Sequence, residues 1–388
     1  MLYTPQFFTI SLAGFLTACN AGAFFLFPLF IADRGGTTVD IGYIMSASFL
    51  ASVLSRPLIS EIIDRLGRKR SYFLANLTMI GTTLSCIGFT GALRDFFWPL
   101  LLIRMIHGIS GGFTFTAGFT YVMDIIPGKR MNEGVGIFGA FSLIGFAVGP
   151  VMAEFFIDQW GFSAYFLAAA GLPAIGAFLL LFLPESHVVG RGSGAGSYMA
   201  LLKRPKIFTV TVLMFILGMG LASTSGFISL FAQSRGIALV STYFIAYSAS
   251  ATALRLVGGK FIDRVGEDRV APYALIVGGF GLIFLLFMNS MVYLLVAGLI
   301  SGSSQGMLYP SLNTMAVRNE PTNLRARIMA TITGALDLGS FAGSIILGQI
   351  GKALGFPAIF ATAGVGFFVG FIMIKIYSMR YQDIQTRG

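Results

Sequence analysis

Long apolar stretches separated by short polar segments dominate the pattern of hydrophobic and polar positions along the chain. A membrane-spanning helix needs roughly 20 predominantly apolar residues to cross a hydrocarbon core about 30 Å thick. Stretches of that length occur at 5–32, 41–63, 71–93, 97–124, 133–157 and 161–183, and again at 207–233, 241–263, 270–289, 292–317, 326–350 and 356–378. The pattern therefore predicts an all-α integral membrane protein with 12 transmembrane helices.

One polar segment divides the twelve stretches into two sets of six. It has the sequence PESHVVGRGSGAGSYMALLKRPK and is rich in Gly, Ser and basic residues. Segments of this composition behave as flexible linkers. We therefore predict a six-helix bundle at 1–183, a cytoplasmic linker at 184–206 and a second six-helix bundle at 207–388.

The composition excludes a water-soluble protein. Hydrophobic residues make up 56% and charged residues 11% of the chain, and the mean hydropathy is +0.83, whereas a soluble domain carries roughly 25% charged residues. The formal net charge of +10 does not indicate a nucleic-acid partner, because the basic residues lie mainly in short segments between the apolar stretches. The expected surroundings of the chain are therefore the lipid bilayer.

Lysine and arginine also predict the orientation. Most of the 26 Lys and Arg residues fall on the same side as both termini, and Arg34, Arg94, Arg235 and Lys352 fall on the other. Because Lys and Arg accumulate in cytoplasmic loops, we expect both termini in the cytoplasm. No cationic leader or cleavage pattern precedes the first span, so we expect it to be retained. The prediction is a multi-pass protein of a bacterial-type inner membrane.

The two sets of stretches repeat each other in sequence. At an offset of 199, 56-RPLISEIIDRLGRKR-70 aligns with 255-RLVGGKFIDRVGEDR-269, which superposes Arg56 on Arg255 and Gly67 on Gly266. At an offset of 194, Gly108, Ser110, Gly112 and Pro127 align with Gly302, Ser304, Gly306 and Pro321. Two six-helix repeats of the same orientation explain both alignments.

The repeated loop carries the most specific motif of the chain. The segments 64-DRLGRKR-70 and 263-DRVGEDR-269 resemble the loop signature G-x-x-x-D-R-x-G-R-[RK] of the major facilitator superfamily (MFS), although Ser60 replaces the leading Gly of the first copy and the second copy lacks the basic run. The resemblance implies the MFS fold, two pseudo-symmetric six-helix bundles.

In that family the loop acts as a conformational latch. A carboxylate at a helix end can pair with loop arginines in one conformation and release them in another. The resemblance makes Asp124 the expected partner of Arg68, and the latch would comprise Asp64, Arg65, Gly67, Arg68, Asp124, Asp263, Arg264 and Gly266. The alternative is an ordinary basic loop on the cytoplasmic side.

Two further segments resemble motifs of the same family. In the span at 97–124, 104-RMIHGISGG-112 is similar to R-x-x-Q-G-x-G, and the resemblance implies that Arg104 takes part in proton coupling. A structural role, bonding carbonyls of the first span, is the alternative.

The second segment, 145-GFAVGP-150, resembles the G-x-x-x-G-P core of the signature associated with antiporters. It implies a helix seam of Gly145, Gly149 and Pro150 that seals the path between the halves, but Gly-x-x-x-Gly also marks ordinary close packing of helices. Ala153 and Glu154 stand where two more glycines are expected.

Ionisable groups inside the spans are candidates for coupling or substrate binding, because burying a charge in the bilayer is costly. Asp337 lies about 12 residues into its span, near the midplane, where it can hold a proton or contact substrate; a helix-packing hydrogen bond is the alternative. Glu154 lies about one turn from the outer end of its span, where it could also meet water.

Arg56 and Arg255, with Arg104, would make a central cavity cationic and suited to an anionic or zwitterionic substrate. Alternatively, each pairs with a carboxylate such as Glu61 or with helix-end carbonyls. Uncharged polar groups within spans either face the cavity or link helices; these are Asn20, Gln305, Tyr309 and Asn313.

These features favour a secondary active transporter over other classes. Our leading interpretation is proton-coupled efflux of a small organic molecule by alternating access, as in the twelve-helix drug and metabolite antiporters of the family; an uptake symporter or uniporter for an organic anion or metabolite is the alternative. An enzyme is not expected, since His107 and His187 have no companions at metal-ligand spacing. We expect a monomer that uses a proton gradient and binds no metal or cofactor.

Overall fold

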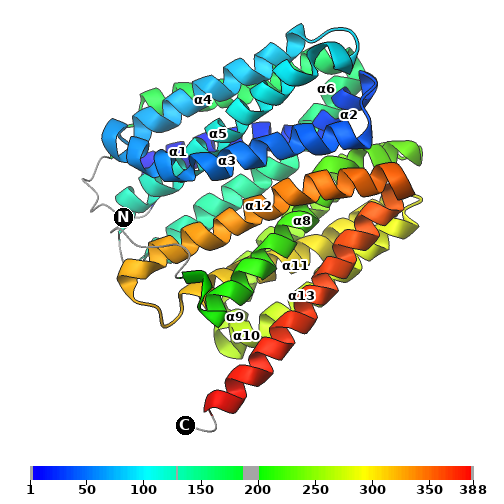
Figure 1. Cartoon of the computed structure of the whole chain (residues 1–388). Helices are drawn as coiled ribbons and strands as arrows, with labels where there is room; N and C mark the ends of the chain where they lie inside the picture. Colours follow the sequence, from blue (N-terminus) through cyan, green and yellow to red (C-terminus); the bar gives the residue numbers. More distant parts are fainter. Residues whose placement is uncertain (1–2, 128–129, 187–200, 386–388) are drawn as a thin grey trace.

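Helices and short turns make up all of the structure that is described (Figure 1). The structure, a computed structural model, describes residues 3–127, 130–186 and 201–385 of the 388. Within these ranges the side chains of 257–261 and 263, and of several others, are not described. Most of the linker predicted at 184–206 lies outside the described residues, so its boundaries stay a prediction.

The first half contains six helical legs. They are α1 (Pro5–Ala23), which continues through η1 (Phe24–Leu26) into α2 (Phe27–Asp33); α3 (Thr38–Leu66); α4 (Arg68–Ser85) with η2 (Cys86–Gly88); α5 (Leu93–Ile125); and the two legs of α6 (Met131–Leu181). Gly161 divides α6, because its backbone has a φ of 77° that only glycine adopts without strain. The legs of α6 are therefore two separate crossings.

The second half repeats this arrangement. Its legs are α8 (Pro205–Ser234), α9 (Ser241–Val265), α10 (Glu267–Phe284) with η4 (Leu285–Phe287), α11 (Met291–Val317), α12 (Thr322–Leu354) and α13 (Phe356–Gln385). The described part of the chain has 9 candidate membrane spans by length and hydropathy, with both legs of α6 in one of them and the more polar α4 and α9 outside the set. The all-helical membrane fold expected from the sequence is confirmed.

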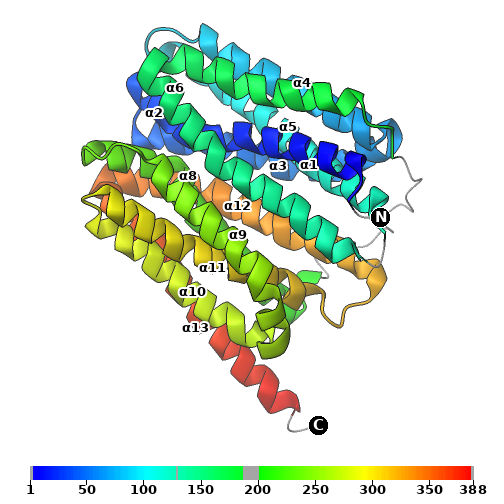
Figure 2. The same cartoon turned by 180° about the vertical axis from the view of Figure 1, so that it is seen from behind.

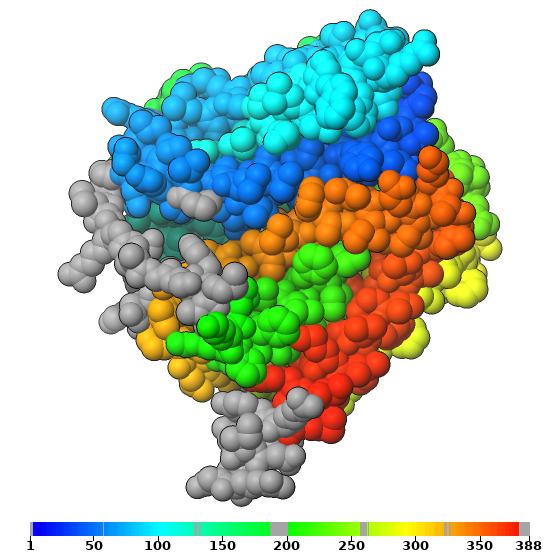
Figure 3. Space-filling view, viewed as in Figure 1, coloured from blue at the N-terminus to red at the C-terminus, as the bar shows by residue number. Residues whose placement is uncertain are grey.

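The two halves meet along two helix pairs. Figures 1 and 3 show α12 lying along α3, and Figure 2 shows α9 beside α6; the helices of each pair pack against each other. We call the end that carries Gly67, Gly266 and both chain termini the terminal end. The opposite end, which carries Gly161, Val240 and Gly355, is the far end.

Glycines set the distance between helices inside each half. A Cβ atom on Gly145 would lie 2.6 Å from the carbonyl oxygen of Phe15, and one on Gly149 would lie 2.5 Å from the backbone nitrogen of Ala23. These glycines therefore let α6 approach α1 within the first half, and Pro150 follows them on the same helix. The close approach that these glycines allow lies within the first half, and the expected role of the seam in sealing the path between the halves stays a prediction.

Candidate functional site

An ion pair at mid-depth joins the two halves. Arg56 on α3 donates from Nε to Oδ2 of Asp337 at 3.2 Å, and its Nη2 donates to the same oxygen. Nη1 donates to Oγ1 of Thr333 at 2.9 Å, and the Ser52 hydroxyl donates to Oδ2 of Asp337 at 3.3 Å. Asp337 lies near the middle of the 33-residue α12. The carboxylate is therefore held from the opposite half by a guanidinium and a hydroxyl.

The sequence left the partner of Arg56 open, and the structure decides it. Glu61, one of the expected alternatives, pairs with Arg65 one turn along the same helix. The side chains of Arg56 and Asp337 are 33% and 17% exposed, so water reaches the pair only partly. A charge pair in such surroundings is sensitive to the protonation of its carboxylate.

Glu154 forms a second contact between the halves, at the far end. Its carboxylate accepts hydrogen bonds from the backbone nitrogens of Val240, at 2.6 Å, and Ser241, at 3.2 Å. These nitrogens belong to the first turn of α9, whose N–H groups lack partners within the helix and whose dipole favours a negative charge. Glu154 thus caps a helix of the other half instead of simply facing water.

Other contacts close the far end. Thr38 donates to the carbonyl oxygen of Gly348 at 3.1 Å, and Gln349 donates to the hydroxyl of Tyr43 at 3.4 Å. The hydrogen bonds described between the two halves lie between the level of Arg56 and the far end. The halves are therefore joined at mid-depth and at the far end.

Arg104 is enclosed within the first half. It is 4% exposed, and its Nη2 donates to the hydroxyl of Ser48 at 3.1 Å. The guanidinium lies 4.7 Å from the ring centre of Phe24 and 5.2 Å from that of Phe27, within the range of a cation–π interaction. Its Nε and Nη1 are buried without hydrogen-bond partners among the described residues. Arg104 therefore contacts the first span through rings and not through carbonyls.

Arg255 and three polar side chains of α11 line the seam between α9 and α11. The Arg255 guanidinium lies 5.4 Å from the ring centre of Tyr309. Its Nε, together with Oε1 of Gln305 and Oδ1 of Asn313, is buried without a hydrogen-bond partner in the described structure. Buried polar atoms of this kind are rare unless water or a ligand satisfies them.

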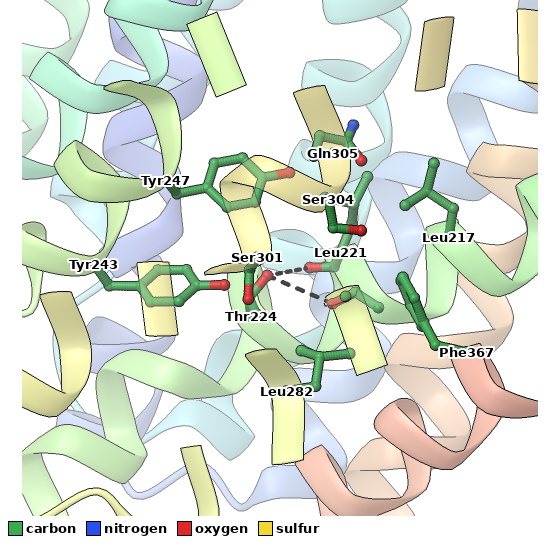
Figure 4. A pocket seen from close by; sticks show the side chains of 12 residues that line it. Leu217, Leu221, Thr224, Tyr243, Tyr247, Leu282, Ser301, Ser304, Gln305 and Phe367 are labelled. Carbon is green, nitrogen blue, oxygen red and sulfur yellow. Dashed lines mark hydrogen bonds between the residues drawn. The ribbon is translucent and has the colours of Figure 1, made fainter. Parts of the chain in front are cut away.

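Gln305 also lines a small cavity inside the second half, between α8, α9, α10, α11 and α13 (Figure 4). Tyr243, Tyr247, Thr224 and Ser301 contribute polar groups to its walls. The cavity offers about 30 Å³ of room for water, far below the roughly 300 Å³ of a drug-sized site. In this conformation it suits water molecules.

Asn20 links helices within the first half. It is fully buried, and its Nδ2 donates to Oγ1 of Thr83 at 3.2 Å and to the carbonyl oxygen of Ala169 at 2.8 Å. Of the two roles expected from the sequence, this geometry corresponds to an interhelical link and not to a cavity group.

The first predicted latch loop has the expected contacts. Arg68 lies 3.0 Å from Asp64 and 3.2 Å from Asp124, and Gly67 between α3 and α4 has a φ of 93°. Glu185, which the sequence did not single out, accepts hydrogen bonds from the backbone nitrogens of Lys69 and Arg70. The loop is thus tied to the end of α5 and to the segment that follows α6.

The second latch loop keeps the turn but changes the charges. Gly266 has a φ of 92°, Arg264 is exposed, and the side chain of Asp263 lies outside the described residues. Glu267, which is 2% exposed, lies 2.8 Å from Arg318 at the end of α11. Sequence reasoning missed this pair, although the two repeat offsets align Glu267 with Arg68 and Arg318 with Asp124.

The described residues contain no cluster of three or more His, Cys, Asp or Glu side chains that could hold a metal ion. The candidate site offers carboxylates, guanidinium groups and hydroxyls. Carboxylates bind and release protons, and all three kinds of group bind charged or polar small molecules.

Comparison with known sequences gives one consistent result. Residues 10–279 and 238–383 match the sequence model of the Major Facilitator Superfamily. The multidrug resistance protein MdtG of Klebsiella pneumoniae is 26% identical over 360 residues, covering 88% of this chain and 85% of that protein. MdtG of Escherichia coli is 25% identical over 360 residues, covering 88% and 86%.

Solved structures show the same fold. The nucleoside transporter NupG has a TM-score of 0.76 and 18% identity, with 96% of this chain and 99% of that chain covered. A POT family transporter in complex with 5-aminolevulinic acid has a TM-score of 0.80 and 14% identity, with 96% of each chain covered. At these identities the likeness concerns the fold alone.

Proposed function

Because the chain belongs to the major facilitator superfamily and is a multi-pass membrane transporter, we propose that it exports small organic molecules in exchange for protons. The similarity to the multidrug resistance protein MdtG supports export. The observation that carries proton coupling is the ion pair between Arg56 and Asp337, since it joins the two halves at mid-depth through a group that can be protonated.

The contacts of Asp337 suggest how a proton would drive the transport cycle. Protonation removes the negative charge that attracts Arg56, so the ion pair between α3 and α12 weakens and the halves can separate there. Loss of the proton restores the carboxylate and the pair with Arg56. The pair also supplies an intramembrane arginine with the charge compensation that it needs.

The closed far end supports loading of substrate from the cytoplasm. Contacts between the halves are found from mid-depth to the far end, including those of Glu154 and Thr38. If the termini are cytoplasmic, as the distribution of Lys and Arg predicts, the far end, where the halves are joined, faces away from the cytoplasm. An exporter takes up its substrate in this conformation.

The experiment that tests the proposal uses proteoliposomes with an imposed pH gradient and a pH-sensitive dye. A panel of anionic, neutral and cationic drugs is added to the wild type, to Asp337→Asn and to Asp158→Asn, whose carboxylate is exposed near the far end. We expect drug-induced proton movement in the wild type and in Asp158→Asn, and a rate lower by about tenfold or more in Asp337→Asn.

Proton movement that is equal in the wild type and in Asp337→Asn would contradict coupling through Asp337. Movement of drug and protons in the same direction would show that the protein is a symporter and would contradict exchange. Binding of the drug to Asp337→Asn, measured separately by equilibrium dialysis, shows that the variant is folded.

A further inference from the structure

Arg56, Arg104 and Arg255 lie within membrane-spanning helices, and their positive charges are compensated in different ways. Arg56 has the carboxylate of Asp337 beside it. Arg104 and Arg255 have no carboxylate partner among the described residues. An arginine at membrane depth normally pairs with an acidic group or faces a polar cavity. Arg104 and Arg255 therefore lack the negative charge that normally accompanies an arginine at this depth.

The repeat shows which carboxylate Arg255 lacks. Arg56 and Arg255 are equivalent at the offset of 199, and α9 packs against α6 as α3 packs against α12. Gly145 and Gly149 of α6 pack on α1, and Gly339 and Gly343 of α12 pack on α8. The two glycine pairs are separated by 194 residues, so α6 and α12 are equivalent at the offset of 194.

This alignment places Leu143 at the position of Asp337. Leu143 is 8% exposed. The second copy therefore keeps the arginine but has an apolar residue in place of its acidic partner.

The surroundings of Arg255 suit an organic ligand. The ring of Tyr309 lies under the guanidinium, and Gln305 and Asn313 lie one turn to either side of Tyr309 on α11. Oγ1 of Thr252 on α9 is also buried without a partner in the described structure. A guanidinium fork binds planar or tetrahedral oxyanions with two parallel hydrogen bonds. The neighbouring amides and hydroxyl offer further hydrogen bonds, and the ring offers apolar contact.

Arg104 is less suitable, although it too has no carboxylate. It is 4% exposed and lies between Phe24, Phe27 and Ser48 inside the first half. Arg255 is only half-buried. Part of the Arg255 side chain is therefore accessible without opening a bundle, and the repeat places it at the position that Arg56 occupies beside the other half.

We propose that Arg255 binds the negatively charged group of the transported molecule, so that the substrates are small organic anions with an apolar part that contacts Tyr309. The inference deepens the proposed export function and rests on it. The substrate supplies at Arg255 the negative charge that Asp337 supplies at Arg56.

The test compares two probes that differ only in charge, dansylglycine and its neutral amide, with ethidium as a cationic third probe. Transport is measured in proteoliposomes that contain the full chain, under the same pH gradient as above. We expect the wild type to transport dansylglycine faster than the amide by about tenfold or more, because a site built for an ionic group rejects the analogue that lacks it. In Arg255→Gln the rates of the two probes become similar, while Arg255→Lys keeps part of the preference.

A second pair of variants tests the missing carboxylate directly. Leu143→Asp should supply Arg255 with an internal partner and abolish the preference for dansylglycine, whereas Leu143→Asn should retain it. Each variant is first checked for an unchanged elution profile in size-exclusion chromatography. Loss of the preference in Leu143→Asp alone therefore reports on charge and not on folding.

The outcomes separate this inference from the proposed function. Transport of the amide as fast as the anion by the wild type, or a preference that persists in Arg255→Gln, would overturn the anion site. Transport of ethidium without transport of dansylglycine would overturn it as well and leave export intact. If none of the three probes moves, both the anion site and the export function are contradicted.

Discussion

Glu267 and Arg318 form an ion pair, with 2.8 Å between Oε1 and Nε, at the position where the first half has Arg68 and Asp124. The offset of 199 aligns Glu267 with Arg68, and the offset of 194 aligns Arg318 with Asp124, so the two halves carry the same bridge with its charges exchanged. Each bridge joins the start of one helix to the end of the next. The position of the ion pair is therefore the same in both halves, whereas the acidic and basic residues are exchanged. Attraction between these helix ends, and not the sign of either charge, is the shared feature.

Removing Arg318 is expected to destabilise the second half. Arg318→Ala leaves the buried carboxylate of Glu267 without its partner, and this should lower the free energy of unfolding by about 1–3 kcal/mol. Unfolding in mixed detergent and SDS measures the change. As a control, Arg65→Ala removes a pair with Glu61 that is 76% and 55% exposed and should change stability by less than about 1 kcal/mol.

A charge exchange tests the same bridge. Glu267→Arg combined with Arg318→Asp reproduces the polarity of the first half and should recover most of the stability lost in Arg318→Ala. A double variant less stable than either single substitution would argue against the equivalence of the two bridges.

The seam between α1 and α6 is expected to tolerate no side chain. In Gly149→Ala the new methyl group would lie 2.5 Å from the backbone nitrogen of Ala23, so the helices must separate, at a cost of about 1–3 kcal/mol. Thermal unfolding in detergent measures it. Gly139→Ala on the same helix meets nothing within 4 Å and should be neutral or slightly stabilising, by about 1 kcal/mol at most. Equal effects of the two substitutions would be inconsistent with a close-packed seam.

Glu154 is expected to hold the far end closed. Glu154→Gln removes the charge that interacts with the start of α9, a contribution of about 0.3–1 kcal/mol and up to about 2 kcal/mol when partly buried. The population open at the far end should therefore rise severalfold. Spin labels at Arg94 and Leu354, both exposed, report it as a longer distance in double electron–electron resonance. An unchanged distance distribution would show that the cap does not control closure.

The buried charge of Arg104 is expected to lower the stability of the protein. Its Nε and Nη1 are buried without partners in the described structure, so Arg104→Met should raise the free energy of unfolding by about 1–4 kcal/mol while transport falls. Arg94→Met replaces an 88% exposed side chain and should change stability by less than about 0.5 kcal/mol. A destabilised Arg104→Met would show that the contacts with Phe24 and Phe27 outweigh the cost of burying the charge.

Features that depend on neighbouring residues were predictable from the sequence. The length of an apolar stretch determines whether it can cross a bilayer, so the predicted spans correspond to the helical legs, with ends displaced by a few residues; α12, for example, begins at Thr322 instead of 326. The Asp-Arg-x-Gly loops also follow from local chemistry, because the positive φ of Gly67 and Gly266 is a property of one residue. The repeat added the equivalence of Arg56 and Arg255.

Contacts between distant residues were decided by the tertiary structure alone. Asp337 was a candidate from its depth in a span, but its partner Arg56 lies 281 positions away, and Glu154 caps a helix that begins 87 positions later. Helical periodicity places a side chain on a face without telling which helix that face meets or at what height. Close packing at glycines such as Gly149 sets that register between helices, and with it which residue of the other half lies opposite Arg56.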